Sequence, residues 1–69
     1  MDRIPVNSST IVDIGYDASL MTLELGFKQG AVYQYFDVPD AVYQELMRAD
    51  SKGTFFHANI KNNYRYTKL

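Results

Sequence analysis

The feature that most constrains this chain is a three-residue segment, Lys28-Gln29-Gly30, between two stretches in which apolar and polar residues alternate. Alternation with a period of two is typical of a strand with one buried face. A three-residue hairpin loop ends in a left-handed residue, where glycine fits without strain. Such a loop would place Leu25 opposite Tyr33. It would also place Leu23 opposite Tyr35, so both tyrosines would share the apolar face of the preceding strand.

A second hairpin is predicted before the first. Residues 10–16 also alternate, with Val12, Ile14 and Tyr16 on the face that we expect to be buried. A four-residue turn after Tyr16 would pair Ile14 with Leu23. The three predicted strands then form an antiparallel meander with one apolar face.

The pattern after the meander changes to the spacing of helices. A proline opens residues 39–50, as is typical of a first helical turn, and apolar residues recur there along one stripe. Phe56 and Ile60 are four residues apart, which indicates a shorter helix near residues 52–61. We therefore predict an α+β fold, a three-stranded antiparallel meander covered on one face by two short helices. Tyr64-Arg65-Tyr66 would form a short C-terminal strand or an extended tail.

The length of the chain allows one domain. With 69 residues and no cysteine, it has neither a disulfide nor a thiolate metal site, so an apolar core must stabilise it. We expect a flexible arm over residues 1–9, which are polar and contain Pro5, and a single domain over residues 10–69. No apolar run approaches the ~20 residues of a membrane span, and the first residues do not resemble a secretory leader. These features predict a cytoplasmic protein without membrane contact.

Charge is unevenly distributed along the chain. Residues 1–50 hold all eight acidic residues, whereas residues 51–69 hold four of the seven basic residues and the only histidine. A basic segment interleaved with aromatic residues suits single-stranded RNA, because cations contact phosphates and aromatic rings stack on bases. The candidate nucleic-acid-binding residues are Lys52, Phe55, His57, Lys61, Tyr64, Arg65, Tyr66 and Lys68. The alternative is that these basic residues merely balance the acidic half.

No catalytic or metal-binding motif accompanies these residues. A serine triad would require His57, and nothing in the sequence resembles a nucleophile elbow. A single histidine without a paired ligand is no metal site, and the glycine pattern of a phosphate loop is missing. We therefore predict a protein that is not an enzyme and holds no cofactor or metal. A small hydrolase that uses His57 is the third hypothesis.

The open face of the predicted sheet offers a different kind of site. Opposite the buried face, Val32 and Phe36 would lie exposed beside Thr22 and Glu24. An exposed apolar pair on a sheet suits a protein partner or a second copy of the chain. A protein-interaction or dimerisation module is therefore the alternative function, and the sequence leaves the oligomeric state open.

An ordered series of motifs resembles the KTSC domain, which is named after the C-terminal domain of some lysyl-tRNA synthetases. The motifs are Ile14-Gly15-Tyr16-Asp17, Leu23-Glu24-Leu25, the run from Val32 to Pro39, Val42-Tyr43, the run from Leu46 to Ala49, the run from Ser51 to Phe56, Ile60-Lys61 and Tyr64-Arg65-Tyr66.

The resemblance covers about residues 10–68 and departs from the family at His57, where we expect asparagine. It implies a small domain, appended to some synthetases or free-standing, for which RNA binding has been suggested and which has no catalytic residues. Together with the basic segment, it predicts a non-catalytic binding module with RNA as its ligand.

Overall fold

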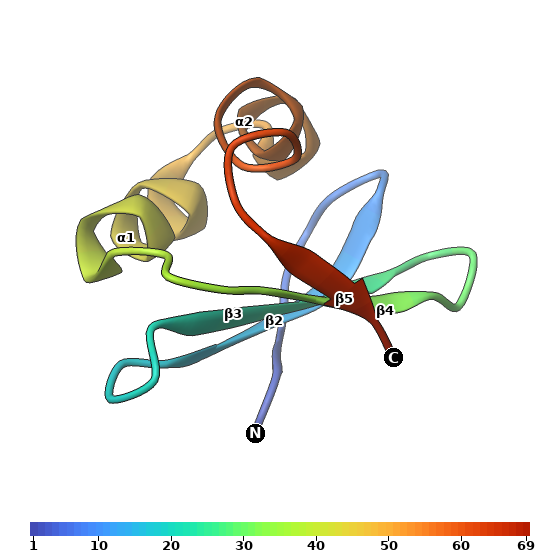
Figure 1. Cartoon of the computed structure of the whole chain (residues 1–69). Coiled ribbons are helices and arrows are strands. Elements are labelled where there is room, and N and C mark those ends of the chain that lie inside the picture. The colour runs from blue at the N-terminus through green and yellow to red at the C-terminus, as the bar shows by residue number, and fades with distance from the viewer.

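The computed structural model describes residues 1–69 and contains two helices and five strands. In chain order the elements are β1 (Ile4–Pro5), β2 (Ile11–Asp17), β3 (Thr22–Phe27), β4 (Val32–Tyr35), α1 (Asp40–Arg48), α2 (Lys52–Asn59) and β5 (Tyr66–Lys68). The strands form one antiparallel sheet in the order β1-β2-β3-β4-β5. Both helices cover the same face of this sheet (Figure 1), which confirms the α+β class. The predicted meander is the centre of a wider sheet, with β1 and β5 at its edges.

The β3–β4 hairpin has the predicted register. Leu25 pairs with Tyr33, and Leu23 pairs with Tyr35. Gly30 has a φ of +101°, and nothing lies within 4 Å of where its Cβ would be. The loop therefore requires glycine for its backbone conformation and not for space. This register turns both tyrosines toward the helices.

The β2–β3 register is two residues away from the predicted one. Ile14 pairs with Leu25 rather than Leu23. The strand runs on through Asp17, whose carboxylate accepts hydrogen bonds from two turn amides at 3.0 and 3.2 Å. The turn ends at Met21, which has a left-handed φ of 51°. A shift by two residues keeps each side chain on the same face, so the apolar face is preserved.

A β-bulge overturns the predicted orientation of Val12. The pairing of β2 with β3 shifts between Ile11 and Asp13, so Val12 has no partner in the ladder. Ile11 is consequently fully buried, whereas Val12 is 42% exposed. The alternating pattern predicted the reverse for both residues, because a bulge shifts the alternation by one residue.

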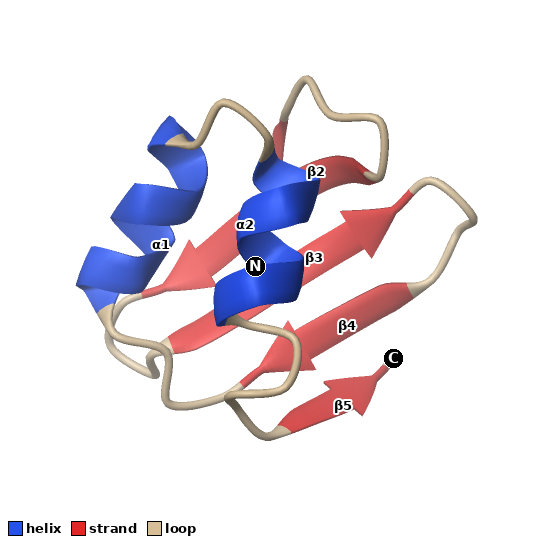
Figure 2. Cartoon of the chain, turned by 90° about the horizontal axis from the view of Figure 1, so that it is seen from above, coloured by secondary structure: helices blue, strands red, loops and turns tan.

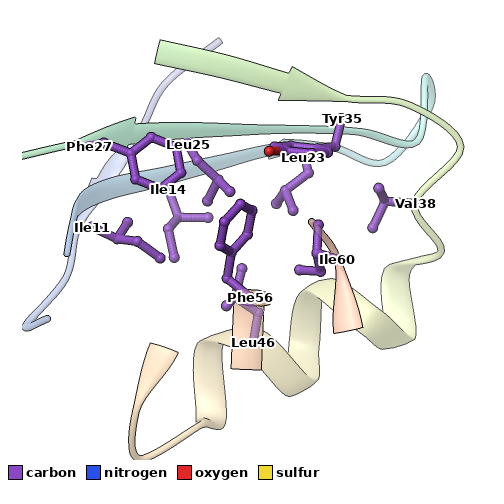
Figure 3. Close-up of a cluster of buried hydrophobic side chains, with 10 residues drawn as sticks. All are labelled: Ile11, Ile14, Leu23, Leu25, Phe27, Tyr35, Val38, Leu46, Phe56 and Ile60. Carbon is purple, nitrogen blue, oxygen red and sulfur yellow. The ribbon is translucent and has the colours of Figure 1, made fainter. Parts of the chain in front are cut away.

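The core lies between the sheet and the helices (Figure 3). Its ten buried hydrophobic residues are Ile11, Ile14, Leu23, Leu25, Phe27, Tyr35, Val38, Leu46, Phe56 and Ile60. Helix α1 is also held by an aromatic stack, in which the rings of Tyr16 and Tyr43 lie 4.6 Å apart. The hydroxyl of Tyr16 donates to the carbonyl of Val38 at 2.6 Å. Helix α2 begins after Ser51, whose side chain accepts a hydrogen bond from the amide of Thr54.

The N-terminal residues add contacts on the face opposite the helices. Strand β1 pairs with β2, and the Arg3 guanidinium forms ion pairs with Asp13, at 2.9 Å, and with Glu24. A Cβ at Gly15 would lie 2.7 Å from a backbone oxygen of this segment, so glycine permits its close approach. Residues 1–9 therefore contribute a strand and an ion-pair network, while their predicted flexibility stays a prediction.

Glu24 is a buried carboxylate that depends on these contacts. It is only 6% exposed, and it accepts hydrogen bonds from Gln34, at 2.8 Å, and from Arg3. Burial acts to raise the pKa of Glu24, but the hydrogen bonds from Gln34 and Arg3 and the charge of Arg3 outweigh it and lower the pKa from 4.5. A carboxyl group with a lowered pKa in the folded state adds stability above its unfolded pKa. That stability is lost as the pH falls through the folded pKa.

Removal of Arg3 should destabilise the fold through Glu24. Arg3→Ala leaves a buried carboxylate without its cation, at an expected cost of about 1–3 kcal/mol in the free energy of unfolding at neutral pH. Adding Glu24→Gln should recover part of this loss, because a neutral amide needs no cation. The cost of Arg3→Ala should also shrink as the pH falls below 4.5. Urea unfolding of the single and double variants at several pH values measures both effects. Strictly additive losses of unfolding free energy in the double variant would contradict the first effect, and a cost of Arg3→Ala that does not change with pH would contradict the second.

Candidate functional site

A cavity of about 280 Å³ opens on the helix side of the sheet. Figure 2 shows that β4 and β5 lie to one side of both helices. The cavity is lined by five aromatic and five polar residues, which are Thr10, Phe27, Gln29, Tyr33, Tyr35, Phe56, His57, Lys61, Asn62 and Tyr66. Pockets for drug-sized ligands typically measure about 300–1,000 Å³, so this one suits a single ring system.

Three tyrosines from two neighbouring strands form the aromatic wall of the cavity. The β4–β5 pairing places Tyr66 opposite Tyr35 and Lys68 opposite Tyr33. Because directly opposed residues share a face, all four side chains lie on the helix side of the sheet. The ring centroid of Tyr66 lies 5.6 Å from that of Tyr35 and 5.7 Å from that of Tyr33. The Phe56 ring of α2 meets Tyr35 edge-on at 5.5 Å and joins this wall to the core.

The rim of the cavity is basic. His57 and Lys61 are four residues apart, at the end of α2 and just beyond it, and both are exposed. Lys68 adds a second ammonium group on the same face, at the edge strand β5. None of the lining residues is acidic. A ligand in this cavity would therefore meet positive charge at the rim and aromatic rings inside.

The predicted nucleic-acid-binding residues are only partly brought together. His57, Lys61 and Tyr66 line the cavity, and Lys68 shares their face of the sheet. Arg65 alternates with Tyr66 along the chain and lies on the side of Phe36, outside this cavity. It lines a second, more open hollow together with Tyr64 and Tyr66. Its guanidinium lies 5.4 Å from the centre of the Phe36 ring and forms an ion pair with Asp37 at 2.8 Å.

Three further predicted residues lie away from the cavity. The ammonium group of Lys52 donates to the carbonyl of Ala49 at 3.1 Å, at the beginning of α2. Phe55 and Tyr64 are half-buried and pack against the core. Among the predicted stacking residues, Tyr66 is therefore the one that the structure places in the cavity.

The face opposite the helices is less open than the sequence predicts. Val32 and Phe36 are half-buried rather than exposed, and Thr22 and Glu24 beside them are buried. Arg3 and Gln34 bind the Glu24 carboxylate on this face, and the Arg65 guanidinium lies over the Phe36 ring. The expected exposure of Val32 and Phe36 is therefore wrong, and for Phe36 the covering cation is the reason. The protein interface itself stays a prediction.

For Tyr33 and Tyr35 the sequence favours packing against the helices over stacking on bases, and leaves both roles open. Their register on the buried face is as predicted, yet both also line the cavity, because β5 widens the sheet beyond α2. Thr10, Gln29 and Asn62 were missed, since they come from three separate loops. The repeated Tyr-x-Tyr pattern at residues 33–35 and 64–66 was the available signal. The pairing of β4 with β5 was needed to interpret it.

No group of three or more His, Asp or Glu side chains lies close enough to hold a metal ion. Neither helix has the length and apolar character required to cross a membrane. Every buried side-chain nitrogen and oxygen has a hydrogen-bond partner.

The burial of Tyr35 should be visible in its titration. Burial, followed by the charges of Tyr33 and Tyr66, raises the pKa of Tyr35 to about 12 from an ordinary value of 10.0. A spectrophotometric titration should therefore show a tyrosine that ionises near pH 12, and Tyr35→Phe should remove that step. Because the folded pKa is raised, the related stability is complete below pH 10 and is lost as the pH rises toward 12. An unchanged titration of Tyr35→Phe would contradict this burial.

Comparisons with known proteins agree with this fold. The model of the KTSC domain family matches residues 7–64. The crystal structure of a KTSC domain protein from Yersinia pestis superposes with a TM-score of 0.94 and is 45% identical in sequence. That match covers 99% of this chain and 96% of the other.

Two kinds of relative share this sequence. The chain is 40% identical over 70 residues to an uncharacterized protein from Stutzerimonas stutzeri, and the match covers 100% of this chain and 99% of the other. It is 43% identical over 61 residues to a lysine–tRNA ligase from Trichormus variabilis, a match that covers 88% of this chain but only 11% of the ligase. The chain thus spans about a tenth of the length of that ligase. On the family match and these identities, the chain belongs to the KTSC domain family.

Proposed function

We propose that this KTSC domain is a non-catalytic module that binds single-stranded RNA on the helix side of its sheet. The observation that supports this function is the meeting of His57, Lys61 and Tyr66 at one aromatic cavity without acidic residues. Single-stranded RNA is held by cations on its phosphates and by aromatic rings under its unpaired bases. A site with both groups on one face suits that ligand.

The likeness to lysine–tRNA ligases agrees with this function. The name of those relatives ties them to tRNA, and a segment like this chain forms 11% of one of them. A small module of this kind would add contacts to an RNA without taking part in the chemistry of the ligase. We extend the RNA contact, and not the ligase activity, to this chain.

The charge distribution predicts weak binding that is confined to one face. The net charge of the chain is −1, so RNA is not attracted to the molecule as a whole. Asp13 and Glu24 lie on the opposite face of the sheet, where Arg3 pairs with both. Lys61 and Lys68 have no ion pair with the protein, so their charges are available to phosphates.

The dependence of RNA affinity on salt concentration, compared between variants, separates this function from a nonspecific effect of net charge. Each phosphate contact contributes about 0.7 to the log–log salt slope for a single strand, so two to three contacts should give a slope between roughly −1.4 and −2. Lys61→Ala combined with Lys68→Ala should reduce the slope by roughly 1.4. Arg65→Ala is the matched control, because it removes a cation from the opposite face and should leave the slope unchanged.

Fluorescence anisotropy with a labelled single-stranded oligonucleotide measures these slopes. Loss of binding in Arg65→Ala as large as in the lysine variant would assign the attraction to net charge and not to this face. Absence of binding at low salt would remove RNA as the ligand. The protein interface at Val32 and Phe36 would then be the hypothesis to test, by the dependence of the measured mass on concentration.

A further inference from the structure

The cavity points to a more specific ligand than an RNA backbone. We propose that it takes the base of one unpaired nucleotide against Tyr33, Tyr35 and Tyr66, with the attached phosphate on Lys61. This inference rests on the proposed function and deepens it. It assigns part of the affinity to insertion of a base, whereas backbone charge alone would account for salt-dependent binding.

The geometry of the aromatic wall suits a planar ring. Tyr66 is 58% exposed although its ring lies within 6 Å of two other tyrosines, so part of its ring surface is free for a ligand. Its plane is tilted by 33° from Tyr35 and by 45° from Tyr33. Tyr33 and Tyr35 are more nearly parallel, at 24°, so the Tyr66 ring stands at an angle to the other two. With a volume of about 280 Å³, the cavity has room for one base.

The polar lining suits the edge of a base. Gln29 and Asn62 carry amides, each of which can donate and accept hydrogen bonds. The amides of Asn59 and Asn63 are engaged with the backbone, at 3.2 Å to Phe55 and at 2.8 Å to Asn59. The Asn62 amide, between them in the chain, has no such bond and lies at the cavity. Nucleobases present donors and acceptors along their edges, which free amides can read.

The charge of the cavity favours a nucleotide over a quaternary ammonium group, which is another ligand that three tyrosines could bind. Aromatic cages take quaternary ammonium groups, because the faces of aromatic rings attract cations. Here the Lys61 ammonium group stands in the lining without any carboxylate, so a cation would be repelled. An aromatic group that carries an anion could stack on the tyrosine rings and also bind the basic rim. A nucleotide combines an aromatic base with an anionic phosphate, and its base offers edge groups for the free amides.

The test compares two single-stranded RNA octamers with the same number of phosphates, one normal and one without bases. Wild-type protein should bind the normal octamer about tenfold or more tightly than the abasic one, because stacking on an aromatic side chain favours the base. Tyr66→Ala should remove this difference. Tyr66→Phe, which keeps the ring, should preserve it. The side chain of Tyr66 lies at an edge strand and is largely exposed, and circular dichroism would confirm that both variants fold.

The outcomes separate this inference from the proposed function. Equal, salt-dependent affinity for both octamers would overturn base insertion and leave RNA binding intact. No binding of either octamer would overturn both. Adenosine monophosphate serves as the minimal probe in an NMR titration and should shift the resonances of Tyr33, Lys61 and Tyr66.

The same titration identifies the source of the ligand. Binding of the mononucleotide at least as tight as that of the octamer would support base insertion and assign the cavity to a free nucleotide, against the RNA function. N-acetyltyrosinamide represents an aromatic side chain of a protein partner. Shifts caused by this probe and not by the mononucleotide would overturn the proposal.

Discussion

The positions of the three site tyrosines and of Lys68 depend on the register of β4 between its two neighbours. The Gly30 loop pairs β4 with β3 so that Tyr33 and Tyr35 point toward the helices. Strand β5 then pairs with β4 and brings Tyr66 to the same face. A slip of one residue would reverse this side-chain arrangement and would place Arg65 at the cavity instead. Backbone hydrogen bonding therefore determines which residues of the basic segment can reach a common ligand.

The cavity exists because the sheet is wider than the layer of two helices that covers it. The helices cover the central strands and place Phe56 against Tyr35, while β4 and β5 extend beyond them (Figure 2). Tyr35 is consequently part of the core, whereas Tyr33 is half-buried and Tyr66 is largely exposed. Burial thus decreases step by step from the core to the rim. On the other face, Arg3 and Glu24 form a polar network, and a separate, more open hollow is lined in part by Phe36, Tyr64 and Arg65.

Local patterns in the sequence were sufficient to predict the centre of the fold. The Gly30 loop predicted one register correctly, and the spacing of Phe56 and Ile60 predicted the core face of α2. Features that depend on remote pairing were not predictable in the same way. The bulge at Val12 interrupts an alternation that looks regular in the sequence. Arg65 lies on a different face from Lys68 because β5 pairs with β4, a strand more than thirty residues earlier in the chain. This separation could be seen only once that pairing was known.

The arrangement of β5 is tested most directly by nuclear Overhauser contacts of the Tyr66 ring. We predict contacts from this ring to the rings of Tyr33 and Tyr35, because the ring centroids of the three tyrosines lie within 6.4 Å of one another. We predict none to the Phe36 ring, because Phe36 directly follows Tyr35 at the end of β4 and turns to the other face. Contacts of Tyr66 with Phe36, together with contacts of Arg65 with Tyr35, would show that β5 is shifted by one residue. That result would contradict the assignment of Tyr66 and Lys68 to the cavity face.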